Sequence, residues 1–440
     1  AMTIRRGLAA LAILLCALLV VAPLLTAQEN GSALPEKPSA APEQAEKKEV
    51  QGYTLSPEKL QKAIELSRAR NWLYFIDVVY GLLILLLVLR FRLAPKYRDI
   101  AERASARRFL QVIIFLPLFV LTVDSIGLPT AIYGQWLSLK YDQSVQSWGS
   151  WFGDWVKGEI VGLIIFTLLI WILYAVIRRS PRRWWLYFWM ATMPIIVFLI
   201  FLAPLVIDPL FFKFTPLENT QPQLVSEIEK VVKRGGLEIP RDRMFESNAS
   251  TKYKTVNAYV TGMGASKRVV VWDTAIQKMN TPQTLFVFGH EMGHYVLNHI
   301  RNGILFIAGL LFVFFYIGYR GMKWAVARWG PAWGIRGVDD WASLPVFMLI
   351  LAVLFFLASP IFTGFSRWQE HNADIYGLEV THGLTPDSPE VAGQAFAIAA
   401  PLQPSACGLP REGIAAALVA GKAAAHAGRG RRGAFDPAHH

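Results

Sequence analysis

The chain has 440 residues, of which 54% are hydrophobic or aromatic and only 17% are charged, and its mean hydropathy is +0.35. A soluble globular domain carries about 25% charged residues, so this composition excludes an ordinary soluble protein and indicates a membrane protein. The net charge is +12, but Lys and Arg cluster in short segments between apolar runs, which is typical of membrane topology signals and argues against nucleic-acid binding.

The two cysteines, Cys16 and Cys407, exclude a disulfide framework and a cysteine metal site. One of them lies inside an apolar run, and the other lies near the end of the sequence. Any metal must therefore be held by His, Asp or Glu side chains.

Seven stretches are apolar enough to span a bilayer, which takes about 20 helical residues. The first follows Arg5 and Arg6 and ends before a polar segment, so residues 1–27 are predicted to be either a signal peptide or a first transmembrane helix. The stretches run approximately over 8–27, 71–90, 109–135, 159–177, 184–207, 303–319 and 342–363.

Two long polar segments interrupt these spans. Residues 28–60 are rich in Glu, Lys, Pro, Ala and Gln, and this composition predicts a solvated linker. Residues 208–300 are complex enough in sequence to hold a folded domain outside the membrane. Within them, helical periodicity runs from Gln221 to Arg234, and the pattern over 255–273 predicts a β-hairpin around a Gly-Met-Gly-Ala-Ser turn.

Three loops between the spans are strongly basic. Segment 90–108 holds seven Lys or Arg, segment 178–183 holds four Arg, and segment 320–336 holds four more basic residues. If every span is a single crossing, these loops share one side of the membrane, which the positive-inside rule makes cytoplasmic. The same rule predicts that residues 208–300 lie on the exoplasmic side.

The pattern His290-Glu291-x-x-His294 carries the most specific chemistry in the chain. Positions four apart on a helix lie on one face, so the two imidazoles can bind one zinc ion. Glu291 is offset from both and is predicted to act as the general base that activates water for peptide hydrolysis. We expect Gly293 to leave room beside the metal for a substrate.

A catalytic zinc needs a third protein ligand, and Glu370 is the leading candidate. Asp374 follows one helical turn later and is predicted to hydrogen-bond a ligand histidine, which fixes the tautomer of that ring. His371 and Glu379 remain alternative ligands. His299, five residues after His294, is interpreted as a capping or surface histidine.

These motifs together resemble the type I CAAX prenyl endopeptidases, a family of seven-span membrane zinc proteases, over about residues 55–396. Besides the histidine motif, the matching segments are Asp208-Pro-Leu-Phe-Phe-Lys-Phe-Thr-Pro-Leu217, Asn257-Ala-Tyr-Val-Thr-Gly262, Lys267-Arg-Val-Val-Val-Trp-Asp-Thr274 and Ser366-Arg-x-x-Glu-x-x-Ala-Asp374. The resemblance implies a barrel of tilted helices around a chamber that holds one Zn²⁺ per chain. It also implies that the strand with Asn257, Ala258 and Tyr259 binds an extended substrate backbone.

Two features depart from the family. Its catalytic side faces the cytosol, whereas the basic loops predict the exoplasmic side for residues 208–300. From about Ala400 the chain is rich in Ala, Gly and Arg, whereas the family continues with a folded segment that contains a His-Pro-Ser-like motif and a following Arg.

The predicted fold is mainly α: a polytopic helical barrel with about seven spans around a chamber, plus a small α+β zinc metallopeptidase domain with a β-hairpin. The expected partners are a peptide or protein substrate, lipid-modified or not, and the lipid bilayer of a bacterial inner membrane. The expected divisions are a signal peptide or first span at 1–27, a linker at 28–60, spans at 61–207, the peptidase domain at 208–300, two further spans at 301–365, a third-ligand helix at 366–396 and an atypical tail at 397–440.

Three alternatives stay open at this point. The chain could be a transporter or channel, because Asp77, Asp124 and Glu159 lie in or beside apolar spans, where ionisable groups are usually functional. The halves of the chain show no internal repeat, however, and many transporters have one. Within the protease class, the shorter HtpX-type membrane proteases share the metal motif, and zinc could also be bound without catalysis.

Overall fold

The computed structural model describes residues 57–262, 267–385 and 388–399. All of these residues belong to one compact unit. The expected first span, most of the expected linker and the tail beyond residue 399 lie outside the described residues.

Six long helices in the described part of the chain have the length and composition to cross a membrane. They coincide with the last six expected spans when residues 203–211 are counted with the helix before them and residues 341–343 with the helix after them. This agreement follows from apolar length alone, because a helix rises 1.5 Å per residue and must cover about 30 Å of hydrocarbon. The helices are α2 (Pro57–Arg90), α4 (Arg108–Lys140), α5 (Trp148–Arg179), α6 (Trp184–Leu202), α12 (His299–Trp333) and α13 (Leu344–Thr381). Shorter elements in the connections are α3 (Leu93–Ala104), the π-helix η1 (Ala203–Ile207), α7 (Asp208–Phe211) and η5 (Trp341–Ser343).

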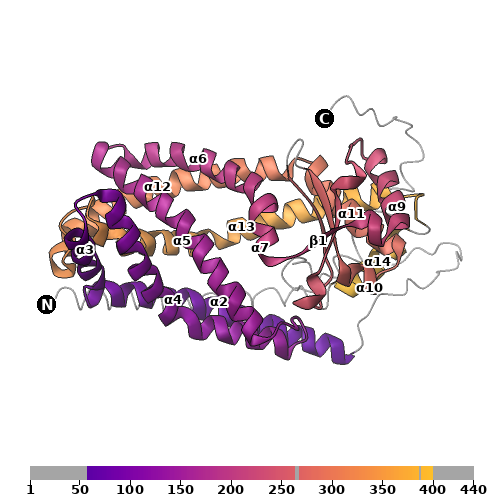
Figure 1. Ribbon diagram of the computed structural model, residues 1–440, viewed down its shortest axis with the longest axis horizontal. Coiled ribbons are helices and arrows are strands. Elements are labelled where there is room, and N and C mark those ends of the chain that lie inside the picture. The colour runs from indigo at the N-terminus through magenta and orange to yellow at the C-terminus, as the bar shows by residue number, and fades with distance from the viewer. Residues whose placement is uncertain (1–56, 263–266, 386–387, 400–440) are drawn as a thin grey trace, which may run out of the picture. The chain divides into compact units, whose positions relative to one another are not determined.

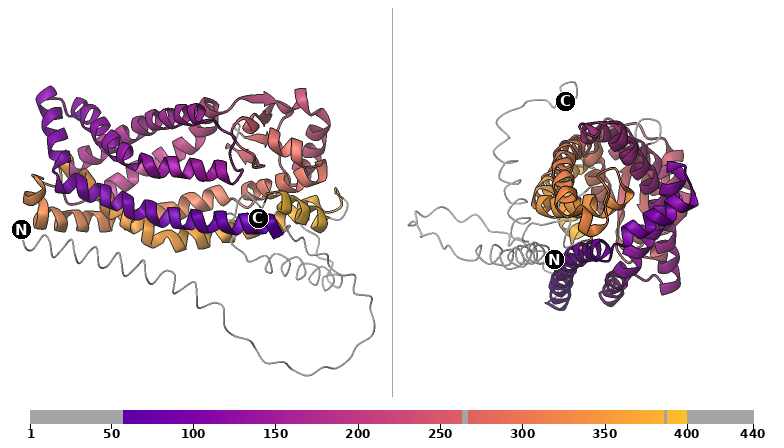
Figure 2. Two further views of the ribbon diagram at one scale, coloured as in Figure 1. Left: turned by 90° about the horizontal axis from the view of Figure 1, so that it is seen from below. Right: turned by 90° about the vertical axis from the view of Figure 1, so that its left-hand side faces the viewer.

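The six helices close into a ring. Each packs against the next in the order α2, α4, α5, α6, α12 and α13, and α13 returns to α2 (Figure 2, right). Large apolar side chains such as Trp72, Ile164 and Leu305 are more than half exposed, as expected for surfaces that contact lipid. The expected helical barrel is thereby confirmed.

The three basic loops gather at one end of the ring, near the α3 label in Figure 1. Buried Arg98 on α3 pairs with Asp340, which precedes η5, at 2.5 Å. The guanidinium of Arg178 lies 4.9 Å from the ring centroid of Trp341. Segments that are far apart in sequence therefore form one positively charged end.

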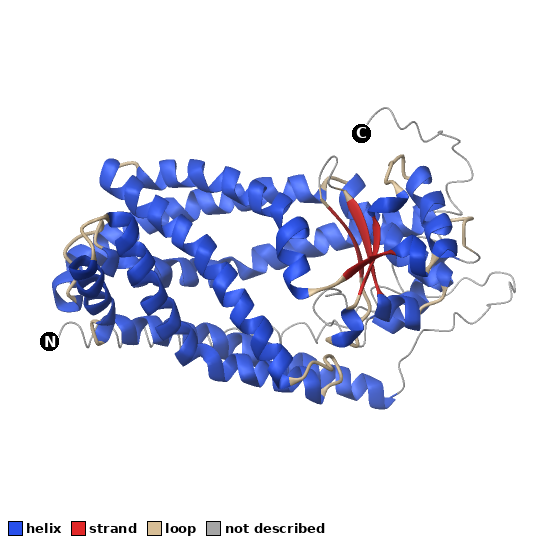
Figure 3. Ribbon diagram, viewed as in Figure 1, coloured by secondary structure: helices blue, strands red, loops and turns tan. Residues whose placement is uncertain are grey.

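A four-stranded sheet lies at the other end (red in Figure 3). Its order is β1-β2-β4-β3, with β2 and β4 parallel and the two outer pairs antiparallel. The antiparallel β3–β4 pair is the expected hairpin, whereas β1 and β2 were not predicted, because they are short and pair with strands remote in sequence. The strands are β1 (Phe214–Pro216), β2 (Met244–Ser247), β3 (Ala258–Thr261) and β4 (Arg268–Trp272).

Helices cover this sheet and complete the domain. Helix α9 agrees with the predicted periodicity, packs against α11 and buries its apolar stripe, including Val225, Ile228 and Val232, in the same hydrophobic core as β4. The helices are α8 (Leu217–Thr220), α9 (Pro222–Arg234), α10 (Asp273–Lys278), α11 (Thr281–Val296) and α14 (Ser388–Ala399).

Polar contacts attach this domain to the ring. Ser144, in the α4–α5 connection, forms an antiparallel bridge with Tyr253. Lys252 is buried, pairs with Asp154 of α5 at 2.5 Å and donates to the carbonyl oxygen of Phe211 at 2.6 Å. A buried ammonium group must be paired, so these contacts fix the domain against the end of the ring.

Among the expected boundaries, the one at residue 365 differs most from the structure. The division at residue 365 falls inside α13, so the last span and the segment that carries Glu370 are one continuous helix. Pro360 lies within this helix without ending it. A polar sequence after an apolar run marks the membrane boundary, and here the helix continues past that boundary.

The single basic end predicts the orientation of the protein. In a variant with Cys16 and Cys407 replaced by Ser, we expect Asn219→Cys, exposed in α8, to react with a membrane-impermeant maleimide in intact bacterial cells. Pro181→Cys, exposed in the loop between α5 and α6, should react only after permeabilisation. The opposite labelling pattern would show that the sheet end is cytoplasmic.

Candidate metal centre

Helix α11 carries the histidine motif and begins with a complete capping box. The side chain of Asn280 accepts from the backbone N–H of Gln283, and the side chain of Gln283 accepts from the backbone N–H of Asn280, both at 3.0 Å. The helix then runs from Thr281 to Val296, which brings His290 and His294 to one face, one turn apart.

Small residues allow α11 and α13 to pack unusually close. A Cβ built on Gly293 would lie 3.2 Å from the Cα of Ala373, and one built on Gly377 would lie 2.9 Å from the backbone nitrogen of His290. A Cβ at Gly377 would therefore clash with the His290 backbone, and a Cβ at Gly293 would make an unusually tight contact with α13. The expectation that Gly293 leaves room for a substrate is therefore wrong, because α13 occupies that space.

This contact brings His290, His294 and Glu370 together, with their ligand atoms all within 4.8 Å of one another. The Nε2 atoms of His290 and His294 are 3.2 Å apart. One carboxylate oxygen of Glu370 lies 3.3 Å from Nε2 of His290, and the other lies 3.8 Å from Nε2 of His294. Two atoms bound to one tetrahedral zinc at about 2.0–2.1 Å would lie roughly 3.4 Å apart. The donor set therefore fits a small divalent cation of the zinc type.

The other residues of the α13 motif have different positions. Asp374 Oδ1 lies 2.8 Å from Nδ1 of His290, on the side of the ring opposite Glu370. His371 and Glu379, the alternative ligands, are exposed, and neither belongs to the cluster. The helix thus presents Glu370 and Asp374 to α11 and turns His371 away.

His299 is not a surface histidine. It is only 5% exposed, and its Nδ1 lies 2.9 Å from Nδ1 of His294. The prediction for His299 is wrong because α11 ends at Val296, before this residue. Asn298 then reverses the chain in the left-handed region, with φ of 57°. Asn298 was the sequence signal for this turn, since Asn tolerates the left-handed conformation at a helix end better than most residues.

The electrostatics of the cluster favour a cation. Burial opposes the charge on His290, but hydrogen bonds to Asp374 and Glu370 raise its pKa to about 10. Burial and the neighbouring His290 lower the pKa of His294 to about 4. Loss of hydration raises the pKa of Glu291 to about 7, with His290 opposing this shift and Glu370 adding to it. The acidic surroundings thus hold one positive charge between the rings, and a metal ion would supply that charge.

Strand β3 borders α11 and forms an edge of the sheet. The backbone N–H of Trp272 donates to the carbonyl oxygen of Asn257 at 3.0 Å, so Asn257 and Tyr259 direct their main-chain groups toward β4. The main-chain groups of Ala258 and Val260 therefore point to the open edge. Burial raises the pKa of Tyr259 to about 12, so its hydroxyl stays neutral.

Comparison with known proteins decides the family. Residues 40–213 match the CAAX prenyl protease N-terminal domain of five membrane helices, and residues 218–400 match peptidase family M48. The chain belongs to peptidase family M48. It is a membrane metalloprotease, and the transporter alternative is wrong.

Individual relatives agree with this family and with the expected resemblance to CAAX prenyl proteases. The chain is 37% identical to the uncharacterised metalloprotease YhfN of Bacillus subtilis over 330 residues, 74% of this chain and 76% of that protein. It is 27% identical to CAAX prenyl protease 1 of Saccharomyces cerevisiae over 264 residues, 57% of each chain. The crystal structure of Ste24p from S. mikatae has a similar fold, with a TM-score of 0.68 at 22% identity over 83% of this chain and 90% of that one. The M48 chain is thus a multi-pass membrane protein, and YhfN agrees with a bacterial inner membrane.

The close approach of α11 and α13 generates a prediction for Gly377. We expect Gly377→Ala to lower the free energy of unfolding by about 1–3 kcal/mol, because the added methyl group must displace the His290 backbone. Metal affinity should fall roughly tenfold or more, since the ligands move apart. Thermal unfolding in detergent and chelator competition measure the two effects.

Gly364→Ala in the same helix is the matched control. A Cβ at Gly364 meets no atom within 4 Å, so this variant should bind metal as the wild type does and be equally stable or more stable by up to about 1 kcal/mol, since Ala favours a helix more than Gly does. Equal behaviour of the two variants would refute the role of close packing in assembling the cluster.

Proposed function

We propose that the chain is a zinc endopeptidase that cleaves extended segments of membrane-associated proteins, with Glu291 as the general base. The observation that carries the proposal is the spacing of His290, His294 and Glu370, whose donor atoms match three ligand positions of one zinc ion. We assign one Zn²⁺ per chain to these residues.

The protein residues have separate roles in this chemistry. Bound Zn²⁺ would supply Lewis acidity, which lowers the pKa of the attacking water toward neutrality and polarises the scissile carbonyl group. Glu291 follows His290 directly and is absent from the ligand group, so its carboxylate is available to take a proton from the attacking water and pass it to the leaving amine. Asp374 accepts from Nδ1–H of His290 and thereby leaves Nε2 of that ring free to bind the metal.

Substrate binding is assigned to the open edge of β3. An extended peptide can add to such an edge through main-chain hydrogen bonds, here with Ala258 and Val260. Asn257 and Tyr259 complete this strand segment, and their side chains would line the neighbouring substrate positions. Recognition through the main chain accepts many sequences, which suits the removal of unfolded membrane-associated segments.

The relatives named CAAX prenyl proteases add lipid-modified peptides to the candidate substrates. Cleavage of a farnesylated peptide and of its unmodified counterpart by the purified protein distinguishes the two classes. Faster cleavage of the farnesylated peptide would favour a lipid-modified substrate, and equal rates would favour recognition of the extended backbone.

Glu291→Gln tests the catalytic assignment. We expect peptide cleavage to fall by about 10²–10⁴-fold, because the amide cannot accept the proton, while zinc content stays at one per chain. Glu379→Gln, exposed on α13, should cleave at the wild-type rate. If Glu291→Gln cleaves at a rate close to that of the wild type, Glu291 is not the general base. If the purified wild-type protein contains no metal, the zinc assignment is wrong.

Val260→Pro tests the substrate edge. Proline removes a main-chain N–H that points away from β4, so KM should rise by roughly 5–10-fold, the loss of about one hydrogen bond, without loss of the β3–β4 pairing. Val260→Ala shortens the side chain but keeps the N–H, and its KM should change less. An unchanged KM in Val260→Pro would contradict strand addition at β3.

A further inference from the structure

We infer that His299 is a positioning residue that fixes the tautomer and ring orientation of His294, an inference that rests on the proposed zinc site. The first observation is its location. Asn298, with φ of 57°, turns the chain between α11 and α12, so the first residue of α12 returns toward the end of the histidine motif. His299 is buried there at 5% exposure.

The contact between the two rings allows one arrangement of protons. Nδ1 of His294 and Nδ1 of His299 are 2.9 Å apart, so one nitrogen must donate and the other must accept. Nε2 of His294 faces Nε2 of His290 and Glu370, where a metal requires its lone pair. The proton of His294 therefore lies on Nδ1 and is donated to His299, whose own proton must be on Nε2.

Helix α13 holds His299 in this position. Gln369 donates to the backbone oxygen of His299 at 3.0 Å, and the ring of Trp368 lies 6.1 Å from the His299 ring, measured between centroids. Both residues directly precede Glu370, so one stretch of helix supplies a metal ligand and the support for another.

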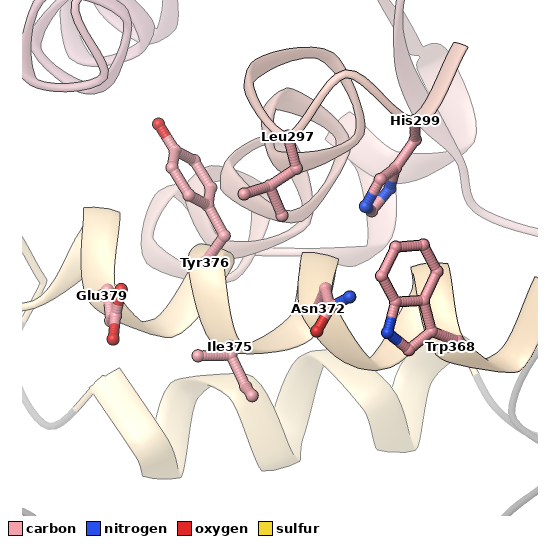
Figure 4. A pocket seen from close by; sticks show the side chains of 7 residues that line it. All are labelled: Leu297, His299, Trp368, Asn372, Ile375, Tyr376 and Glu379. Carbon is pink, nitrogen blue, oxygen red and sulfur yellow. The ribbon is translucent and has the colours of Figure 1, made fainter. Parts of the chain in front are cut away.

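His299 also lines a cavity of about 280 Å³. Figure 4 shows the ring lying over Trp368 and Asn372, with Leu297 and Tyr376 farther along the same cavity. The polar side chains of Asn372 and Glu379 line the same cavity, so hydrogen-bond acceptors are available in the space that the His299 ring borders.

The two ligand histidines thus have supports of different charge. His290 donates to the carboxylate of Asp374, whereas His294 donates to a neutral imidazole. The site already contains the carboxylates of Glu291, Glu370 and Asp374, and a neutral acceptor orients His294 without adding another negative charge. Outer supports of this kind commonly change metal affinity by about 10–100-fold.

The test compares His299→Leu with His299→Asn. Leu fills similar volume but removes the acceptor, whereas Asn has an oxygen close to the position of Nδ1. We expect His299→Leu to bind Zn²⁺ about 10–100-fold more weakly in chelator competition and to change the visible absorption of the Co²⁺-substituted protein. His299→Asn should stay within a few-fold of the wild type and keep its Co²⁺ spectrum.

His371→Leu is the matched control, because it makes the same substitution at an exposed histidine beside Glu370. Its zinc affinity should equal that of the wild type. If His299→Leu does not fold, His299→Gln replaces it in the test, because the amide of Gln lies one bond farther from the backbone than that of Asn. Weaker Zn²⁺ binding by His299→Gln than by His299→Asn supports the inference. Equal Zn²⁺ binding by the two variants overturns it.

The outcomes separate this inference from the proposed function. If the wild-type protein binds no zinc, the proposed zinc site is wrong. Wild-type protein that binds zinc, together with a folded His299→Leu variant of equal affinity and unchanged Co²⁺ spectrum, would overturn the role of His299 alone.

Discussion

The structure depends on the close contact between α11 and α13. Glycine at 293 and 377, with Ala373 opposite, lets the two helix backbones approach until His290 and Glu370, 80 positions apart in sequence, share one site. Helix α13 also packs against α2 and α12, where it closes the ring of membrane helices. The same helix therefore joins the membrane part of the protein to its chemistry, and a shift of α13 would change both.

The charges around the His290–His294 pair determine that this site binds a cation. Two imidazole nitrogens 3.2 Å apart repel through their lone pairs unless a cation or a proton lies between them. The nearby carboxylates of Glu370 and Asp374 stabilise that positive charge, and the limited hydration of the site strengthens every such interaction. On the outer side, Nδ1 of His290 contacts Asp374 and Nδ1 of His294 contacts His299, while both Nε2 atoms face the inside of the cluster.

Much of the fold was predictable because its signals are local. Six spans follow from apolar length, α9 follows from its periodicity, and the β3–β4 hairpin follows from two β-rich runs around a turn. Strands β1 and β2 were missed because three or four residues carry little pattern, and their pairing is set by partners elsewhere in the chain. The boundary at residue 365 failed for another reason: composition marks where the membrane ends, but hydrogen bonding decides where the helix ends.

The sequence by itself determined the spans, the placing of His290 and His294 on one helical face, and the choice of His, Asp and Glu as the available ligands. These properties depend on residues within a few turns of one another, so helical and strand periodicity are sufficient to derive them. Only the tertiary structure decided that Glu370 joins the cluster while His371 and Glu379 face outward, that Gly293 serves helix packing, and that His299 contacts His294. Each of these depends on how α11, α12 and α13 pack, and no local pattern contains the rotation and distance between packed helices.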